Sequence, residues 1–296
     1  MHGSKFNNKF LALFQNPIMK ADLHCHSFFS DGKHSPEFLL QRAKELSITH
    51  IAITDHDCIT MLNKSLVDHY CVKVIPGVEI ACEWESKEIH VVGLGIDHQN
   101  EALQSLLTRQ RTARRERIAA INKLLETQEI KGLPQYVKSL PCVSITRSHV
   151  ADFLISSGIS KNRPQAFSKY LGKQGKAFIP SNWSSLSLTN EAISNAGGIP
   201  VLAHPGRYSL NKRQLNELVG AFKHRGGQAI EVSYGGINPL VQKNLEEIAL
   251  SKGLFVSAGS DFHDAKAHWT DLGKFPGITV RAKKNAVWKH SRWHSQ

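Results

Sequence analysis

The sequence has few cysteines and no pattern that would pair them. Its 296 residues include five, an odd number, and none of them forms a C-x-x-C motif. A disulfide framework is therefore not expected. Cysteines that stay reduced are typical of cytoplasmic proteins, so we expect a cytoplasmic location.

Long apolar runs are also absent from the sequence. No stretch approaches the ~18 residues that a membrane-spanning helix requires. Residues 1–17 contain only a short apolar patch, without the long hydrophobic region and cleavage site of a secretory signal. We therefore expect residues 1–17 to be an N-terminal extension. We expect no association with a membrane and no obligate protein partner. Met19 is an alternative start.

Acidic side chains are scarce relative to basic ones. The chain has 37 Lys and Arg against 25 Asp and Glu, a formal net charge of +12. A positive charge of this size raises the local concentration of phosphorylated or polyanionic partners. A generally basic proteome would give the same balance, so charge alone leaves both interpretations open.

Internal repeats and low-complexity segments are missing as well, and short apolar runs instead alternate with helical patterns. This alternation indicates βα units with parallel strands. The predicted strands are 18–23, 51–54, 74–76, 89–94, 199–203, 229–232 and 254–258. The predicted helices are 36–46, 100–126, 144–157, 163–171, 189–195, 210–223 and 239–251. Ser35 and Pro36 fit the start of the first helix, and Gly253 fits the position past the last.

The middle of the chain breaks the alternation. Residues 100–195 show helical patterns without a strong strand, so we expect a helical insertion that caps a barrel of residues 18–99 and 196–280. Residues 109–117 are strongly basic; they form either a solvated charged face, which we favour, or a track for RNA. Residues 281–296 are predicted to be a flexible basic tail.

Histidine and acidic residues gather where the predicted strands end. His24 and His26 are two residues apart, so they point to the same side of a strand and can hold one ion. Further candidates near later strand ends are His56, Glu79, His90, His204, Asp261 and His263. Each alone could cap a helix or pair with a lysine. Together they predict a metal site, because the strand ends of a parallel α/β barrel share the rim that holds the active site.

Four signatures, in this order, resemble the PHP (polymerase and histidinol phosphatase) domain. They are His24-x-His26, Thr54-Asp55-His56, His204-Pro205 and Ser260-Asp261-x-His263. The resemblance covers nearly the whole predicted barrel and implies an α/β fold, a distorted (β/α)7 PHP barrel with an inserted helical subdomain. The string Ala-His-Pro-Gly-Arg-Tyr at 203–208, together with Arg147-Ser-His149 and Gly175-Lys176, narrows it further. These segments are similar to the bacterial branch of 3′,5′-nucleoside bisphosphate phosphatases and 5′-to-3′ exoribonucleases of the ribonuclease AM type.

The resemblance implies a centre of up to three divalent ions, with Mn²⁺ expected and Zn²⁺ or Fe²⁺ as alternatives. The first ion is assigned to His24, His26, Glu79 and Asp261, the second to Glu79, His90 and His204, and the third to Asp31, His56 and His263. The residues expected to carry catalysis are His24, His26, Glu79, His204, Asp261 and His263. Asp22 and Asp55 are expected to orient imidazole rings from behind the ligands.

The implied activity is that of a metal-dependent phosphoric ester hydrolase. It would remove the 3′-phosphate of nucleoside 3′,5′-bisphosphates and trim short 5′-phosphorylated RNA from its 5′ end. When bound, a divalent ion lowers the pKa of water towards ~7 and neutralises phosphoryl charge. The alternatives are a histidinol-phosphate-type phosphomonoesterase and a non-catalytic PHP scaffold module.

Three basic residues are candidates for the substrate's second phosphate. They are Arg147, Lys176 and Arg207. Arginine offers a planar fork to phosphate and lysine a point charge. Arg207 follows the candidate ligand His204 by three residues, which brings it near the metals. For Arg147 and Lys176, a solvated face fits the sequence equally well, and the resemblance alone favours phosphate.

Overall fold

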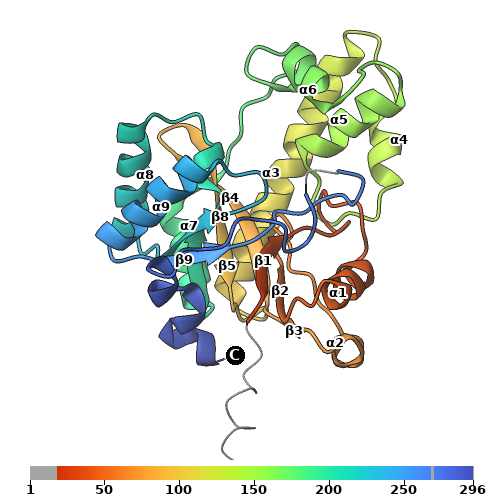
Figure 1. Ribbon diagram of the computed structural model, residues 1–296. Helices are drawn as coiled ribbons and strands as arrows, with labels where there is room; N and C mark the ends of the chain where they lie inside the picture. The colour runs from red at the N-terminus through yellow and green to blue at the C-terminus, as the bar shows by residue number, and fades with distance from the viewer. Residues whose placement is uncertain (1–18, 268–269, 296) are drawn as a thin grey trace, which may run out of the picture.

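A computed structural model describes residues 19–267 and 270–295 (Figure 1). The predicted extension at 1–17 and the start of the first predicted strand lie outside the described residues. The strands are β1 (Ala21–Cys25), β2 (His50–Ile53), β3 (Lys73–Val74), β4 (Gly77–Trp84), β5 (Lys87–Leu94), β6 (Ser184–Ser185), β7 (Ile199–Leu202), β8 (Ala229–Ser233) and β9 (Phe255–Ala258). The α-helices are α1 (Pro36–Glu45), α2 (Lys64–Tyr70), α3 (Glu101–Glu126), α4 (Leu133–Lys138), α5 (Arg147–Ser156), α6 (Arg163–Ala166), α7 (Leu186–Asn195), α8 (Lys212–His224) and α9 (Pro239–Ser251). Shorter helical turns are η2 (Phe167–Leu171), η3 (Pro205–Arg207), η4 (Ala282–Asn285), η5 (Val287–Lys289) and η6 (Ser291–Ser295).

The strands of the described residues follow one another in a ring. One sheet has the order β1-β2-β3 and the other the order β6-β4-β5-β7-β8-β9. Isolated parallel bridges join the two sheets, one between Cys25 of β1 and Phe262 after β9, the other between His56 after β2 and Glu79 of β4. Pro76 separates β3 from β4, because it has no N–H to donate to the ladder. If β3 and β4, which only Ile75 and Pro76 separate, are taken as one position, the ring has the seven positions β1, β2, β3/β4, β5, β7, β8 and β9, which agrees with the distorted (β/α)7 barrel that the resemblance implies.

β5 departs from the predicted parallel arrangement, since it runs antiparallel to both β4 and β7. Glu85 and Ser86 connect β4 to β5, and their φ angles of 47° and 57° are those of a type I′ hairpin turn. The sequence has neither Asn nor Gly at this turn, so β4 is missed and Glu79 is wrongly placed at a strand end. The beginning of β5, with His90, therefore lies at the rim formed by the ends of the parallel strands.

Helices α1 and α9 begin where the sequence predicts. Ser35 Oγ accepts a hydrogen bond from the Phe38 N–H at 3.2 Å, and Pro36 is the first residue of α1. Pro239 begins α9, and Gly253, just past its end, has a φ of 62°. Figure 1 shows α1 and α2 beside β1–β3, and α8 and α9 on the opposite side of the molecule. Within residues 19–267 and 270–295, each helix is too short or too polar to span a membrane.

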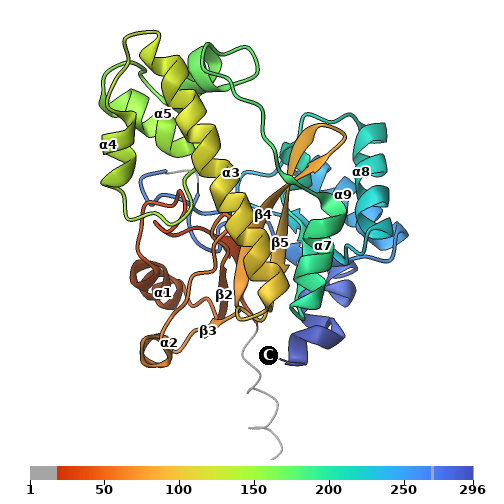
Figure 2. The same ribbon diagram turned by 180° about the vertical axis from the view of Figure 1, so that it is seen from behind.

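α3 connects two hydrophobic cores. Its first half packs through Leu103 and Leu107 with the main core around β4, β5, β7 and β8. Its second half packs through Ile118 and Leu125 with α4, α5 and η2 in a separate core. We call residues 118–179 the helical lobe; Figure 2 shows α3 running from the strands into it. α7 packs on the main core, so the predicted insertion at 100–195 combines the lobe with two segments that pack on the barrel.

The C-terminal residues pack against the barrel, so the prediction of a flexible tail is wrong. Ala286 forms a parallel bridge with Val256 of β9. Val287 and Trp293 are buried in the same cluster as Leu23. Short helical turns without a strand or α-helix period build this segment, which is why the sequence pattern does not reveal its burial.

Candidate metal centre

The end of β1 carries the first pair of candidate ligands. His24 lies in β1 and His26 just after it, both are buried, and their Nε2 atoms are 3.2 Å apart. Asp261, in the loop after β9, places Oδ1 3.1 Å from Nε2 of His26 and 3.4 Å from Nε2 of His24. The three side chains therefore direct donor atoms at one point.

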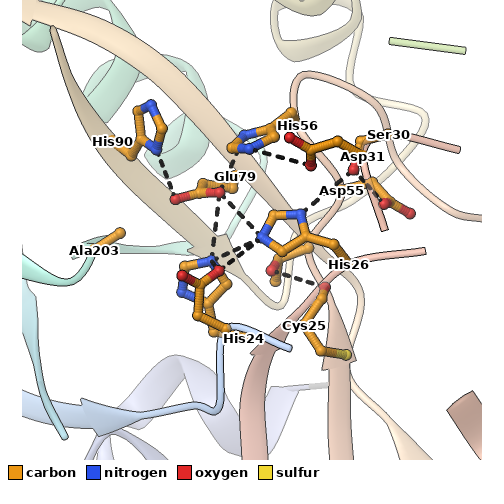
Figure 3. A network of polar contacts seen from close by, with 12 residues as sticks. His24, Cys25, His26, Ser30, Asp31, Asp55, His56, Glu79, His90 and Ala203 are labelled. Atoms are coloured by element: carbon orange, nitrogen blue, oxygen red, sulfur yellow. Dashed lines mark hydrogen bonds and ion pairs between the residues drawn. The ribbon is translucent and has the colours of Figure 1, made fainter. Parts of the chain in front are cut away.

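Glu79 lies at the centre of the cluster (Figure 3). Its buried carboxylate stands near five imidazoles, those of His24, His26, His56, His90 and His204. Oε1 is 2.9 Å from both His90 Nδ1 and His204 Nε2. Oε2 is 3.1 Å from His56 Nδ1 and 3.3 Å from His26 Nε2. Because its two oxygens face different histidines, this carboxylate can bridge two ions.

Asp31 holds the third part of the cluster. Its Oδ1 is 3.3 Å from His263 Nε2 and 3.6 Å from His56 Nε2. The ring of His263 stacks on that of His26, with centroids 4.1 Å apart. Asp31 Oδ2 accepts a hydrogen bond from the hydroxyl of Thr146, the N-cap of α5, at 3.0 Å. The helical lobe thus helps to fix a candidate ligand of the barrel.

The donor atoms have the spacing and chemistry of a metal site. Ligands at about 2.1 Å from one ion stand about 3.0–3.4 Å apart in octahedral or tetrahedral geometry. The structure brings all nine predicted ligands into four overlapping groups, namely His26/Asp31/His56/His263, His24/His26/Asp261, His24/Glu79/His204 and His56/Glu79/His90. Within the described residues, buried Asp31 Oδ1, Glu79 Oε2 and His56 Nδ1 make no hydrogen bond, although Glu79 Oε2 and His56 Nδ1 are only 3.1 Å apart. Such atoms are costly unless paired, and a bound cation would pair them.

The electrostatics of the cluster also favour bound positive charge. Burial alone lowers the pKa of His26, but the carboxylates of Asp261 and Glu79 raise it to about 10. Burial likewise lowers the pKa of His90, yet Glu79 and Glu88 raise it to about 10. Burial raises the pKa of Glu79, but the charges of the surrounding histidines hold it well below its usual range. Metal ions would take the place of these protons.

Two candidate ligands have strained backbones. His204 and Asp261 have φ angles of 31° and 51°, in the left-handed region that non-glycine residues rarely adopt. The His204 N–H donates to Glu231 Oε2 at 2.7 Å, and the Asp261 N–H donates to the His24 carbonyl at 2.7 Å. Strain of this kind concentrates at functional sites, where neighbouring contacts maintain it.

Glu231, in β8, contacts two candidate ligands and was not predicted from the sequence. Its carboxylate is 3.1 Å from Nδ1 of His24 and accepts the His204 N–H, and the residue is only 2% exposed. It therefore orients one ligand ring and holds the backbone of another. The available signal was a lone acidic residue within the apolar strand Ala229–Ser233.

Asp22 and Asp55 contact no imidazole ring directly, unlike the prediction, but Ser30 Oγ, which donates to Asp55, lies 3.4 Å from Nδ1 of His26. Asp22 accepts hydrogen bonds from the backbone N–H groups of Ser260 and Gly273, at 2.8 and 2.7 Å. Asp55 accepts from the Ser27 N–H at 2.8 Å and from the Ser30 hydroxyl at 2.6 Å. Both carboxylates thus hold the loops that carry the ligands.

A cavity of about 140 Å³, which we call the arginine cavity, opens beside the cluster. Its lining includes Asp31, His56 and His90 on the ligand side and Glu88, Arg114, Arg117, Arg147, Phe167 and Trp183 on the other. Arg147 Nη2 is 3.3 Å from Glu88 Oε1, and Arg117 Nη1 is 3.3 Å from Glu88 Oε2. The guanidinium groups of Arg114 and Arg117 lie 4.8 and 5.7 Å from the Trp183 ring centre.

The basic helix is therefore only partly a solvated face. Arg109 and Arg115 are exposed as expected, but Arg114 and Arg117 are buried, so the prediction is wrong for these two. Arg114 pairs with buried Asp57 at 2.6 Å. The spacing of Arg114 along α3 is the same as that of a solvent-exposed charge. Its burial comes from the lobe and from the segment with Trp183, which cover it.

Arg207 and Lys176 lie outside the arginine cavity. Arg207 pairs with Oδ2 of Asp261 and donates to the Gly235 carbonyl at 3.1 Å. Lys176 is exposed and is absent from the lining of the arginine cavity and of the cleft described next, both within the described residues, so its role stays a prediction.

A larger cleft of about 740 Å³, which we call the outer cleft, lies between the helical lobe and the loops after β7, β8 and β9. One wall includes Lys33, Ser148, Asp152, Asn162 and Arg163, and the other Arg207, Gly235, Gly236, Asp261 and His263. The wall formed by the barrel loops therefore contains two of the candidate ligands, Asp261 and His263.

Comparisons with known proteins agree with this geometry. The family model described as "PHP domain" matches residues 22–232. The chain is 35% identical over 273 residues to the 5′-3′ exoribonuclease Rnm of Escherichia coli, covering 90% of this chain and 92% of that protein. It is 34% identical to the 3′,5′-nucleoside bisphosphate phosphatase of Chromobacterium violaceum, covering 85% and 90%. A solved amidohydrolase from Chromobacterium violaceum, with bound sulfate and no metal, superposes with a TM-score of 0.84 at 32% identity, covering 91% and 95%.

Proposed function

The chain belongs to the PHP domain family and is a metal-dependent phosphoesterase, and from this premise we propose that nucleoside 3′,5′-bisphosphates and short 5′-phosphorylated RNA are its substrates. It would remove the 3′-phosphate of the former, leaving a nucleoside 5′-monophosphate and phosphate. It would trim the latter from the 5′ end. The relatives named for these two activities support both halves of the proposal.

The arginine cavity is the observation that carries the proposal. It places Arg117 and Arg147 opposite the ligands His56 and His90, so a substrate with one phosphate at the metals can reach arginine with a second. Trp183 adds an aromatic face, and its buried Nε1 lacks a hydrogen-bond partner among the described residues. Aromatic faces and guanidinium forks are the groups that bind bases and phosphates.

We propose that the nine ligands would hold up to three divalent ions, and that Glu79, whose two oxygens face different histidines, would contribute to more than one of them. Imidazole and carboxylate donors suit Mn²⁺, Zn²⁺ and Fe²⁺. Of these, we propose Mn²⁺ as the preferred ion. Bound ions would activate water at neutral pH and neutralise the charge on the phosphoryl group. Arg147 and Arg117 would hold the second phosphate. Arg207 would bind the substrate from the opposite side of the candidate ligand Asp261. We also propose a cytoplasmic location, because all five cysteines, each within the described residues, are unpaired.

The proposal is tested by release of inorganic phosphate and nucleotide with Mn²⁺ present. The substrates are adenosine 3′,5′-bisphosphate, histidinol phosphate and a short 5′-phosphorylated RNA. We expect the bisphosphate and the RNA to be hydrolysed and histidinol phosphate to be a poor substrate, since it cannot place a second phosphate on the arginines.

Two results would replace the proposal. Preferred hydrolysis of histidinol phosphate would favour the phosphomonoesterase alternative. Purified protein that binds metal but hydrolyses none of the three would favour a scaffold.

A further inference from the structure

We infer that the outer cleft holds the RNA that continues 3′ of the scissile phosphate, an inference that rests on the proposed function. The arginine cavity and the outer cleft meet at the candidate metal centre. Asp31 and His56 line the cavity, whereas Asp261 and His263 line the cleft. Ser148 lines both. A chain that passes from one space to the other therefore crosses the ligands.

The chemistry requires space on that second side. In both substrates the water oxygen bonds to phosphorus, the bond from phosphorus to the ribose O3′ breaks, and a proton ends on O3′. With a bisphosphate the phosphate then leaves alone. With RNA the same phosphate keeps its O5′ bond to the next nucleotide, and the shortened RNA again begins with a 5′-phosphate. The two reactions differ only in what is attached to the phosphate on the side away from the terminal nucleotide.

The arginine cavity and the outer cleft differ in size, as binding of a terminal nucleotide and of a continuing RNA chain would require. The arginine cavity measures about 140 Å³ and is lined by aromatic rings and buried arginines, as a site for a terminal nucleotide needs. The outer cleft measures about 740 Å³ and extends away from the ligands between the lobe and the barrel loops. A small site for the end and a larger one for the continuing chain suit an enzyme that starts at a terminus.

Cations stand on both walls of the outer cleft. Arg163 of the lobe and Lys33, which comes from the loop after β1 and pairs with Asp152 of the lobe, lie on one wall with 35% and 38% of their side chains exposed, and Arg207 lies on the other. Arg163 donates to both oxygens of Asp152, at 2.8 and 2.9 Å, and Lys33 pairs with the same carboxylate.

The cations on the lobe side are the ones available to RNA. Two cations share the single carboxylate of Asp152, so this wall keeps a net positive charge. The facing wall has no such excess, because it contains Asp261, which pairs with Arg207, and Asp264, which lies 3.5 Å from His34. Exposed ends on Lys33 and Arg163 can turn from Asp152 to the phosphates of a single strand, which cationic grooves follow without regard to sequence.

The test compares two substrates on one enzyme. We measure kcat/KM for adenosine 3′,5′-bisphosphate and for 5′-phosphorylated oligoadenylates of increasing length, in the wild type and in Lys33→Gln/Arg163→Gln. Glutamine can still donate to Asp152, and Lys33→Ala and Arg163→Ala singly provide a second set of variants. We expect the ratio of RNA to bisphosphate kcat/KM to fall about tenfold, as for loss of roughly 1.4 kcal/mol of binding.

Salt dependence gives an independent measurement. The slope of log kcat/KM for RNA against log salt should become shallower by about 0.7 for each phosphate contact removed. Arg213→Ala is the matched control, since Arg213 is an exposed arginine on α8 that pairs with Glu217. It should leave both the ratio and the slope unchanged.

Each outcome separates the inference from the function on which it rests. A wild type that hydrolyses neither substrate defeats the proposed function. A wild type that hydrolyses both, with an unchanged ratio and slope in the glutamine and alanine variants, overturns only the role of the outer cleft.

Discussion

Glu231 is a side chain whose contribution can be measured apart from the ligands. It contacts Nδ1 of His24 and the N–H of His204. Glu231→Gln keeps one acceptor but loses the charge that orients the His24 ring, so we expect metal affinity to fall about 10–100-fold. Metal retained after gel filtration and titration with Mn²⁺ measure the change.

The matched control for Glu231 is Glu247→Gln, an exposed glutamate on α9. It should bind metal as the wild type does. Equal affinity in the Glu231 and Glu247 variants would show that the ring of His24 is held by other contacts.

A variant of Arg147 tests whether this residue binds the second phosphate of the proposed substrate. Arg147→Ala should raise KM for the bisphosphate about 10–100-fold, because a charge-assisted hydrogen bond contributes roughly 1.5–3 kcal/mol. A simple phosphomonoester has no group for Arg147, so its KM should change much less. Steady-state kinetics on both substrates decide this, with exposed Arg115→Ala as control. Equal effects on both substrates would count against a role in binding the second phosphate.

The sequence could reveal ligand types but not the contacts behind them. The spacing of His24 and His26 fixes two donors on one side of a strand, whatever the rest of the fold. Glu231 gives no such signal, because a single carboxylate in a strand has the same pattern whether it faces solvent or a histidine. Likewise, the burial of Arg114 and Arg117 depends on segments far away in the chain that cover α3.

At the scale of elements, the pair between Arg114 and Asp57 fixes α3 to the junction of β2 and β4. Asp57 is fully buried, and its N–H donates to the carbonyl of Glu79 at 2.8 Å. Arg114→Leu leaves this carboxylate without its cation, so we expect a loss of about 3–5 kcal/mol in the free energy of unfolding. Urea denaturation measures the loss.

Two further variants test the cause. Arg114→Leu combined with Asp57→Asn should recover part of the stability, since no buried charge is then left unpaired. Arg115→Leu, on the exposed side of α3, should change the free energy of unfolding by less than about 0.5 kcal/mol. If the exposed substitution costs as much, the ion pair is not the reason.

The elements that could be predicted are those with local signals. α1 and α9 have a proline at the first position and a capping side chain, and their bounds follow from neighbouring residues. β4 and β5 are joined by Glu85 and Ser86, whose positive φ angles are imposed by pairing across the hairpin and not by residue type. The tail likewise acquires its place only from contact with β9.

For the whole molecule, metal binding should couple activity to stability. Chelation should abolish phosphate release, and Mn²⁺, Zn²⁺ or Fe²⁺ should restore it. A ligand at 100 times its dissociation constant adds about 2.7 kcal/mol to stability, so metal should also raise the melting temperature. Calorimetry of chelated and reloaded protein measures this. Full activity after chelation, with metal content verified as absent, would contradict a metal-dependent mechanism.

The continuity of α3 through both cores restricts how this protein can change its length. Each residue of an α-helix advances about 1.5 Å and turns by about 100°. Removing one residue between Leu107 and Ile118 would swing the whole lobe a quarter turn or more around the barrel, carrying Thr146 away from Asp31. Changes of about seven or eleven residues, close to two or three full turns, would restore the facing but would move the lobe by more than about 10 Å along the helix axis. Homologous chains should therefore vary in length in the loops of the lobe, and hardly at all within this stretch of helix.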